Sequence, residues 1–110
     1  MTDLLHTIRC VGCEGGIPAL SAQEAKALMP QLKNWQITDD GKWLTQRFTF
    51  KNFYQTMAFV NAIAWIANQE NHHPDLHVGY DYCVVNYQTH AVLGLTQNDF
   101  ICAAKIDQLN

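Results

Sequence analysis

The spacing of the apolar residues changes at about residue 52, and this change limits the folds that the chain can adopt. Over residues 43–50, apolar and polar side chains alternate, which is typical of a strand with one buried face. Over residues 52–70, apolar side chains recur every three or four positions, which predicts a long helix. One apolar stripe of this helix comprises Phe53, Met57, Val60, Ala64 and Ala67, and a second comprises Phe59, Ile63 and Ile66. We expect a helix with so much apolar surface to pack against a sheet and also against another subunit.

Local signals on both sides of this helix predict the remaining elements. Ser21 and Glu24 form a capping box for a short helix that reaches about Leu32, with Pro30 loosening its last turn. A second capping box, over residues 96–99, begins a terminal helix. Strands are predicted over residues 35–38, 43–50, 76–79 and 82–89, joined pairwise by tight turns. The order α-β-β-α-β-β-α predicts an α+β fold, in which a four-stranded antiparallel sheet carries the helices on one face.

The length and charge of the chain restrict its organisation and its partners. A chain of 110 residues has room for one core, and we expect residues 17–110 to form it, with residues 1–16 as an N-terminal extension. The net charge of -3 and the seven scattered Lys and Arg residues argue against a nucleic-acid partner. No segment has the pattern of a signal peptide or a membrane-spanning helix, so we expect a cytoplasmic protein without a membrane partner. A domain of this size would gain stability as a homodimer or homotetramer.

Histidine is the residue type that most strongly suggests chemistry in this chain. His72, His73 and His77 lie close together in the sequence, and His90 follows the last predicted strand. Imidazole has an unperturbed pKa of about 6.5, so it can both donate and accept protons near neutral pH. Two or three converging imidazoles could therefore hold a general acid and a general base. An ordinary structural role is the alternative, and we favour it for His6 and His77.

A metal site is another possible use of these residues, and we consider it unfavourable. The His-His-Pro-x-x-His segment cannot form the helical histidine pair of zinc proteases, and adjacent histidines in an extended segment point to opposite faces. Cys10 and Cys13 form a single C-x-x-C motif, which is a weak zinc signal even if His6 supplies a third ligand. We interpret this motif as a loop with two free thiols, and Cys83 and Cys102 as packing residues.

The sequence resembles the pterin-4a-carbinolamine dehydratase family from about residue 17 to its C-terminus. The matching motifs are Asn71-His72-His73-Pro74-Asp75, Thr89-His90, Gly94-Leu95-Thr96 with Asp99, Trp35, and the Arg47-Phe48-x-Phe50 strand that precedes the long helix. The resemblance implies dehydration of 4a-hydroxytetrahydropterin to quinonoid dihydropterin. This reaction recycles the tetrahydropterin cofactor of aromatic amino-acid hydroxylases. The resemblance also implies that the enzyme needs no metal or dissociable cofactor, since the pterin is the substrate.

The resemblance also implies roles for individual residues. The catalytic residues would be His72, His73 and His90, and the substrate-binding residues would be Trp35, Thr89 and Asp99. His72 and His90 would carry out the two proton transfers, and His73 would mainly hold the substrate. Whether His72 or His90 is the acid stays open. Asp99 would orient a histidine or contact the pterin, although capping alone could explain it. Trp35 would line the pocket, although tryptophan is ordinarily a core residue.

One position departs from the family pattern, and two rival functions remain. Many members carry a carboxylate one helical turn before the first histidine, where this chain has Asn68, which cannot stabilise an imidazolium by charge. Glu70 is close in sequence but faces a different side of the helix. Some members also act as a dimerisation cofactor of a homeodomain transcription factor through the long helix, so a binding module is the first rival. A small metal-binding protein is the second.

Overall fold

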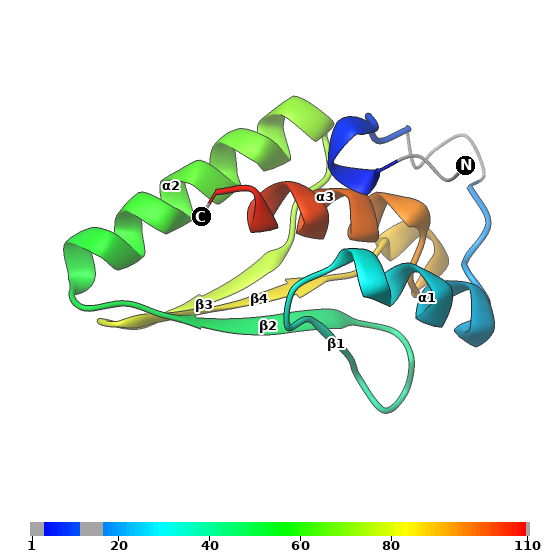
Figure 1. Cartoon of the computed structure of the whole chain (residues 1–110), viewed down its shortest axis with the longest axis horizontal. Coiled ribbons are helices and arrows are strands. Elements are labelled where there is room, and N and C mark those ends of the chain that lie inside the picture. Colours follow the sequence, from blue (N-terminus) through cyan, green and yellow to red (C-terminus); the bar gives the residue numbers. More distant parts are fainter. Residues whose placement is uncertain (1–3, 12–16, 110) are drawn as a thin grey trace.

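The computed structural model describes residues 4–11 and 17–109 of the chain. The four strands form one antiparallel sheet in the order β1-β2-β4-β3. These strands are β1 (Gln36–Ile37), β2 (Leu44–Thr49), β3 (Asp75–Val78) and β4 (Tyr82–Tyr87). The helices α1 (Ala22–Leu28), α2 (Phe53–Glu70) and α3 (Gln97–Asp107) lie on one face of this sheet (Figure 1). The predicted fold class and order of elements are therefore confirmed.

Capping side chains mark the beginnings of the helices, and the sequence predicts those of α1 and α3. At α1, the Ser21 hydroxyl accepts a hydrogen bond from the Glu24 backbone at 3.1 Å, and the Glu24 carboxylate accepts one from the Ser21 backbone at 2.9 Å. At α2, the Asn52 side chain accepts a hydrogen bond from the Gln55 backbone at 3.0 Å. After α1 the chain continues through Pro30 as the 3-10 helix η3 (Met29–Gln31). This tighter turn is the loosening predicted for the end of the first helix.

The end of α2 determines where the first two histidines lie. Asn71 has a φ of 52°, in the left-handed region that Asn tolerates better than most residues, and it terminates the helix. The His72 backbone still donates to the Ala67 carbonyl at 3.1 Å, after which the chain turns into β3. Asp75 of β3 pairs with Asn86 of β4, so the residues just before β3 lie beside those just after β4. This register brings the two segments that carry the candidate histidines together.

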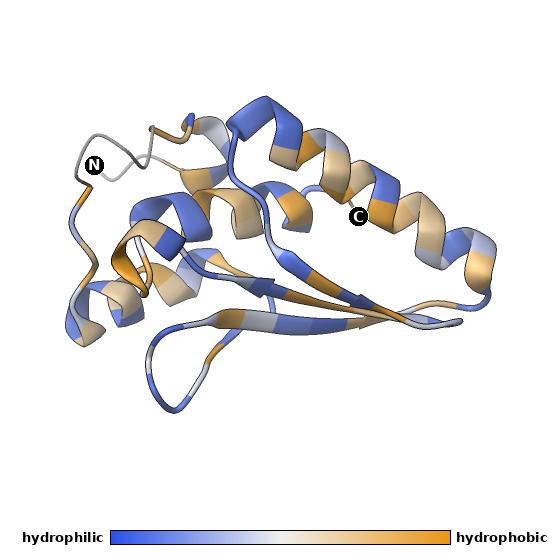
Figure 2. Ribbon diagram, turned by 180° about the vertical axis from the view of Figure 1, so that it is seen from behind, coloured by the Kyte–Doolittle hydropathy of each residue, from blue (hydrophilic) through white to orange (hydrophobic). Residues whose placement is uncertain are grey.

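Only one of the two apolar stripes of α2 faces the sheet. The side chains buried on α2 are those of Thr56, Phe59, Ile63, Ile66 and Ala67. Phe59 packs against Phe48 and Phe50 of the β2 strand and its extension, with ring centroids 4.5 and 5.0 Å apart. Of the other stripe, Phe53 is 49% exposed and only Ala67 is buried. Apolar residues therefore recur along the whole of α2 (Figure 2), and a part of them remains uncovered.

The N-terminal segment packs onto the helical layer. Leu5 is buried, and its backbone donates to the Gln31 side chain at 2.9 Å. The 3-10 helix η1 (Leu5–Thr7) contacts α3, as Figure 1 shows for the blue segment. The predicted boundary after residue 16 and Cys13 of the C-x-x-C motif lie outside the described residues.

In the described part of the chain, no helix is both long enough and apolar enough to cross a bilayer.

Candidate active site

A fully buried carboxylate organises the candidate site. Asp99 lies in the first turn of α3 with none of its surface exposed. Its Oδ2 atom accepts hydrogen bonds from the Thr96 backbone at 3.0 Å and from the Thr89 hydroxyl at 2.8 Å. Its Oδ1 atom lies 2.6 Å from Nε2 of His72. A carboxylate without water must be satisfied by such partners, so Asp99 both caps the helix and binds a histidine.

Among the contacts of His72, two restrain its ring. One is the short interaction with Asp99, and the other is a stacked contact in which its ring lies 5.9 Å from that of Tyr87, at an angle of 6°. The side chain is only 6% exposed. A ring restrained at its edge and on its face has a defined orientation, which is what a proton-transfer group requires.

The three candidate catalytic histidines meet at one pocket. This pocket has a volume of about 140 Å³, and its lining residues are Asn71, His72, His73, Gln88, His90 and Ala91. His73 and His90 are exposed, and their ring centroids lie 6.1 Å apart. His90 begins the 3-10 helix η4 (His90–Val92), shortly after β4 ends at Tyr87. The rings of Trp43 and His90 pack in a T-shaped arrangement, with centroids 6.3 Å apart. One buried imidazole and two accessible ones therefore face the same small space.

Two of the residues predicted to bind substrate are buried and do not line this pocket. Thr89 is buried and contributes its hydroxyl to the Asp99 carboxylate. Trp35 is also buried, and its indole N–H donates to Asp107 at 2.9 Å. Burial raises the pKa of Asp107, and the hydrogen bond from Trp35 opposes that effect. Neither side chain lines the described pocket, and a direct contact of Trp35, Thr89 or Asp99 with substrate stays a prediction.

Tyr87 and Gln88 belong to the site, although no sequence motif identified them. Tyr87 lies on the buried face of β4, which alternates with a half-buried face, but alternation does not reveal that the ring stacks on His72. The Tyr87 hydroxyl is buried without a hydrogen-bond partner among the described residues, and burial raises its pKa well above the ordinary value. Gln88 lines the pocket and donates to the Lys42 carbonyl at 3.2 Å. Their closeness in sequence to His90 is the one local signal that pointed to them.

His77 lies apart from the candidate site. His77 lies on the exposed edge strand β3, near the ring of Tyr82, and does not line the pocket. Within residues 4–11 and 17–109, no three His, Cys, Asp or Glu side chains are grouped so that they could hold a metal ion.

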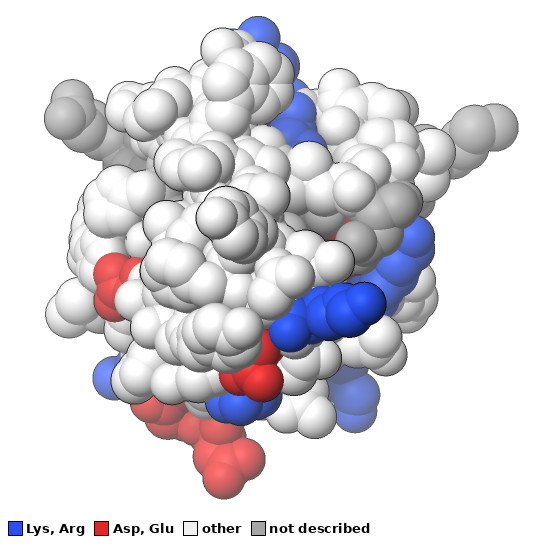
Figure 3. All heavy atoms as spheres, turned by 90° about the vertical axis from the view of Figure 1, so that its left-hand side faces the viewer, with Lys and Arg blue, Asp and Glu red and all other residues white. Residues whose placement is uncertain are grey.

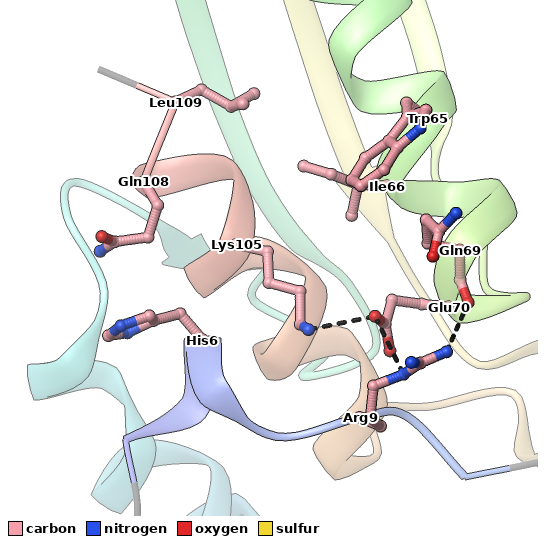
Figure 4. Close-up of a pocket in the computed structure, with 9 residues that line it drawn as sticks. All are labelled: His6, Arg9, Trp65, Ile66, Gln69, Glu70, Lys105, Gln108 and Leu109. Atoms are coloured by element: carbon pink, nitrogen blue, oxygen red, sulfur yellow. Dashed lines mark hydrogen bonds and ion pairs between the residues drawn. The ribbon is translucent and has the colours of Figure 1, made fainter.

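A larger pocket, of about 480 Å³, lies between the end of α2, α3 and the N-terminal segment (Figure 4). Glu70 points into it and contacts Lys105 at 3.0 Å and Arg9 at 3.7 Å. Burial opposes ionisation of Glu70, but a hydrogen bond from the Cys10 backbone and the two basic side chains lower its pKa overall. Glu70 therefore faces away from His72, as predicted, and cannot replace the carboxylate that is absent at Asn68.

Comparison with known proteins agrees with this arrangement. Residues 18–109 match the family model described as Pterin 4 alpha carbinolamine dehydratase. The chain belongs to this family. A protein of Legionella pneumophila (strain Corby), provisionally named a pterin-4-alpha-carbinolamine dehydratase, is 60% identical over 110 residues, which cover 99% of this chain and 97% of the relative. The resemblance inferred from the histidine motifs is thereby confirmed.

Two solved structures extend the comparison. A transcriptional coactivator/pterin dehydratase from Brucella melitensis superposes with a TM-score of 0.80 at 28% identity, covering 84% of this chain and 98% of that one. A pterin dehydratase-like protein, described as a RuBisCO assembly factor in the alpha-carboxysome, superposes with a TM-score of 0.61 at 26% identity, covering 70% and 89%. The dehydratase fold is thus shared by proteins whose descriptions include catalysis and assembly.

Proposed function

We propose that this protein dehydrates 4a-hydroxytetrahydropterin to quinonoid dihydropterin and water. The observation that carries the proposal is the convergence of His72, His73 and His90 on one pocket, with His72 bound to a buried carboxylate. Membership of the dehydratase family supports it. Fold alone would not, because the same fold serves several purposes.

The reaction needs one proton delivered and one removed. The C4a–O bond breaks as the hydroxyl takes up a proton and leaves as water. The N5–H bond releases its proton, and its electrons form the N5–C4a double bond. A pocket with two imidazoles of different surroundings supplies both an acid and a base, each contributing roughly 10²–10⁴-fold in rate.

The surroundings of the histidines suggest how the two proton transfers are divided among them. The negative charge of Asp99 stabilises an imidazolium whenever His72 carries the extra proton, and it holds the ring in place. His90 stands at the accessible side of the pocket and acts as the second proton carrier, while His73 orients the pterin. The proposed pair of proton carriers is thus His72 and His90. Either could be the acid, and the pH dependence of single variants would decide between them.

The proposal includes the cellular setting implied by the reaction. The protein would act in the cytoplasm without a metal or a dissociable cofactor, and it would return the pterin product for reuse by an aromatic amino-acid hydroxylase. Dialysis of the protein against a chelator should then leave its dehydratase activity unchanged. A loss of activity that added zinc or iron restores would contradict the metal-free part of the proposal.

We also propose that the protein is a homodimer or homotetramer that associates through α2. Phe53 is 49%, Tyr54 89% and Trp65 64% exposed on this helix. Figure 3, which views the end of the molecule where α2 begins, shows a broad surface free of charged side chains, with basic and acidic groups toward its margins. Burial of such a surface stabilises an assembly. Light scattering during gel filtration would test this, and a monomer at micromolar concentration would contradict it.

A binding module is the second candidate function. It is favoured by the coactivator and assembly-factor descriptions of the two superposed structures and by the same exposed face of α2. The two functions are separated by an assay of the purified protein alone. Stopped-flow absorbance should show that catalytic amounts of protein accelerate dehydration above the spontaneous rate. A protein that forms only stoichiometric complexes, with no acceleration, would favour the binding module.

A further inference from the structure

Two cysteines from opposite ends of the chain lie in contact close to the candidate site. The Sγ atoms of Cys10 and Cys102 are 3.6 Å apart. Both are free thiols. Cys102 is fully buried in α3, whereas Cys10 lies partly exposed on the N-terminal segment. The sequence predicted two free thiols in a loop at Cys10 and Cys13 and a packing role for Cys102, and it gave no sign of the contact between Cys10 and Cys102.

The backbone around Cys10 is fixed by hydrogen bonds on both sides of the thiol. The Cys10 N–H donates to Glu70 at 2.7 Å. Val11 exchanges two hydrogen bonds with the Asn98 side chain, at 3.1 and 2.7 Å. Figure 4 shows Arg9 directed at Glu70, which Lys105 contacts from the other side. These contacts hold the Cys10 thiol against Cys102. The folded structure therefore keeps the two sulfurs close together, and their contact does not depend on chance encounters.

We propose that Cys10 and Cys102 are a redox modification site, at which a peroxide converts the two thiols into a disulfide. The Cys10 thiol loses its proton, and the thiolate attacks one oxygen of hydrogen peroxide. The O–O bond breaks and the departing hydroxide takes up that proton, so a sulfenic acid and one water are formed. The Cys102 sulfur then attacks the sulfenic sulfur, the S–O bond breaks, and the hydroxide takes the Cys102 proton and leaves as water. Two thiols and one peroxide thus give one disulfide and two waters.

The surroundings of the two thiols determine the order of these steps. The contact with Cys10, together with burial, raises the pKa of the Cys102 thiol far above its ordinary value. Cys102 therefore stays protonated and shielded from solvent, and the partly exposed Cys10 reacts first. Cys102 is the second sulfur, which resolves the sulfenic acid.

The disulfide would tie the N-terminal segment to the helix that carries Asp99. Cys102 lies one turn after Asp99 in α3, and its Sγ is 3.9 Å from the His72 carbonyl. The bond would close a loop of most of the chain, which restricts the unfolded ensemble strongly. We expect the oxidised protein to melt about 5–15 °C higher than the reduced protein. The tether would thereby stabilise the region where α2, α3 and the N-terminal segment meet.

The test treats the full chain with limiting hydrogen peroxide, blocks the remaining thiols and maps disulfides by mass spectrometry without reduction. A peptide linking Cys10 to Cys102 is expected in the wild type, in Cys13→Ser and in Cys83→Ser, and it should be lost in Cys10→Ser and Cys102→Ala. Cys10 is partly exposed, so the result with Cys10→Ser does not depend on how the core variant Cys102→Ala folds. A link only between Cys10 and Cys13, a link only between two chains, or zinc held by these thiols would overturn the proposal. An oxidised form that melts no higher than the reduced form would overturn the stabilising role of the bond.

Discussion

Nε2 of His72 lies 2.6 Å from Oδ1 of Asp99, and both side chains are shielded from solvent. This pair joins the end of α2 to the first turn of α3, two places that the β3-β4 hairpin separates in the sequence. The same carboxylate caps α3 through the Thr96 backbone. One residue therefore connects the stability of the fold to the geometry of the candidate site.

Replacement of Asp99 by Asn should separate the charge of this residue from its shape. The amide can still accept the capping hydrogen bond from Thr96, but it cannot stabilise an imidazolium at His72 by charge. We expect kcat/KM for dehydration to fall about tenfold or more, with the circular dichroism spectrum retained. Asp39→Asn, at an exposed position, is the matched control. An Asp99→Asn enzyme as active as that control would show that the buried charge has no part in catalysis.

Thr89 provides a test of how the carboxylate is supported. Its hydroxyl donates to Asp99 and also contacts the Thr96 hydroxyl at 2.8 Å. Thr89→Val removes that hydroxyl while keeping the branched shape, and it leaves buried oxygens with fewer partners. The free energy of unfolding in urea should fall by about 1–3 kcal/mol, and Thr89→Ser should restore most of it. Equal stability of the Val and Ser variants would be inconsistent with this supporting role.

Tyr87 should respond differently when its hydroxyl and its ring are removed separately. The hydroxyl is buried without a partner among the described residues, so Tyr87→Phe should keep or raise the free energy of unfolding, by up to about 1 kcal/mol. The ring that stacks on His72 is retained in Phe and lost in Leu. Dehydration kinetics should therefore be unchanged in Tyr87→Phe and slower, with a shifted pH profile, in Tyr87→Leu. A slow Phe variant would assign the hydroxyl a role that the stacking contact does not explain.

Glu70 should make the stability of the N-terminal attachment depend on pH. Its pKa in the folded protein is lower than its ordinary value of 4.5, so the ionised form stabilises the fold at neutral pH. This contribution is present above pH 4.5 and is lost as the pH falls through the lower, folded pKa. The difference in unfolding free energy between wild type and Glu70→Gln should therefore shrink on acidification from pH 7 toward pH 3. A difference that is constant or grows in acid would contradict the role assigned to the Arg9–Glu70–Lys105 cluster.

Local signals in the sequence were sufficient to predict the helices and strands and to single out the three candidate histidines. The capping boxes at Ser21 and Thr96 and the alternating strands depend on neighbouring residues only, so they could be recognised without a structure. The histidines could be brought together because the strand order places the residues before β3 beside those after β4.

Features that depend on contacts between distant segments could not be obtained in this way. Periodicity defined two apolar stripes on α2, but only packing with Phe48 and Phe50 determines which one faces the sheet. The partner of Trp35 is Asp107, far away in the sequence, and nothing local indicates this hydrogen bond. The contact of Cys10 with Cys102 is of the same kind.

The central claim is that the pocket histidines catalyse dehydration, and stopped-flow absorbance with 4a-hydroxytetrahydropterin tests it most directly. The rates with wild type, His72→Ala, His90→Ala and His77→Ala are each compared with the spontaneous rate, His77 being the control because it lies outside the pocket. We expect acceleration by wild type and His77→Ala, and a loss of roughly 10²-fold or more in His72→Ala and His90→Ala. Equal rates for all four proteins, or no acceleration by wild type, would contradict the account.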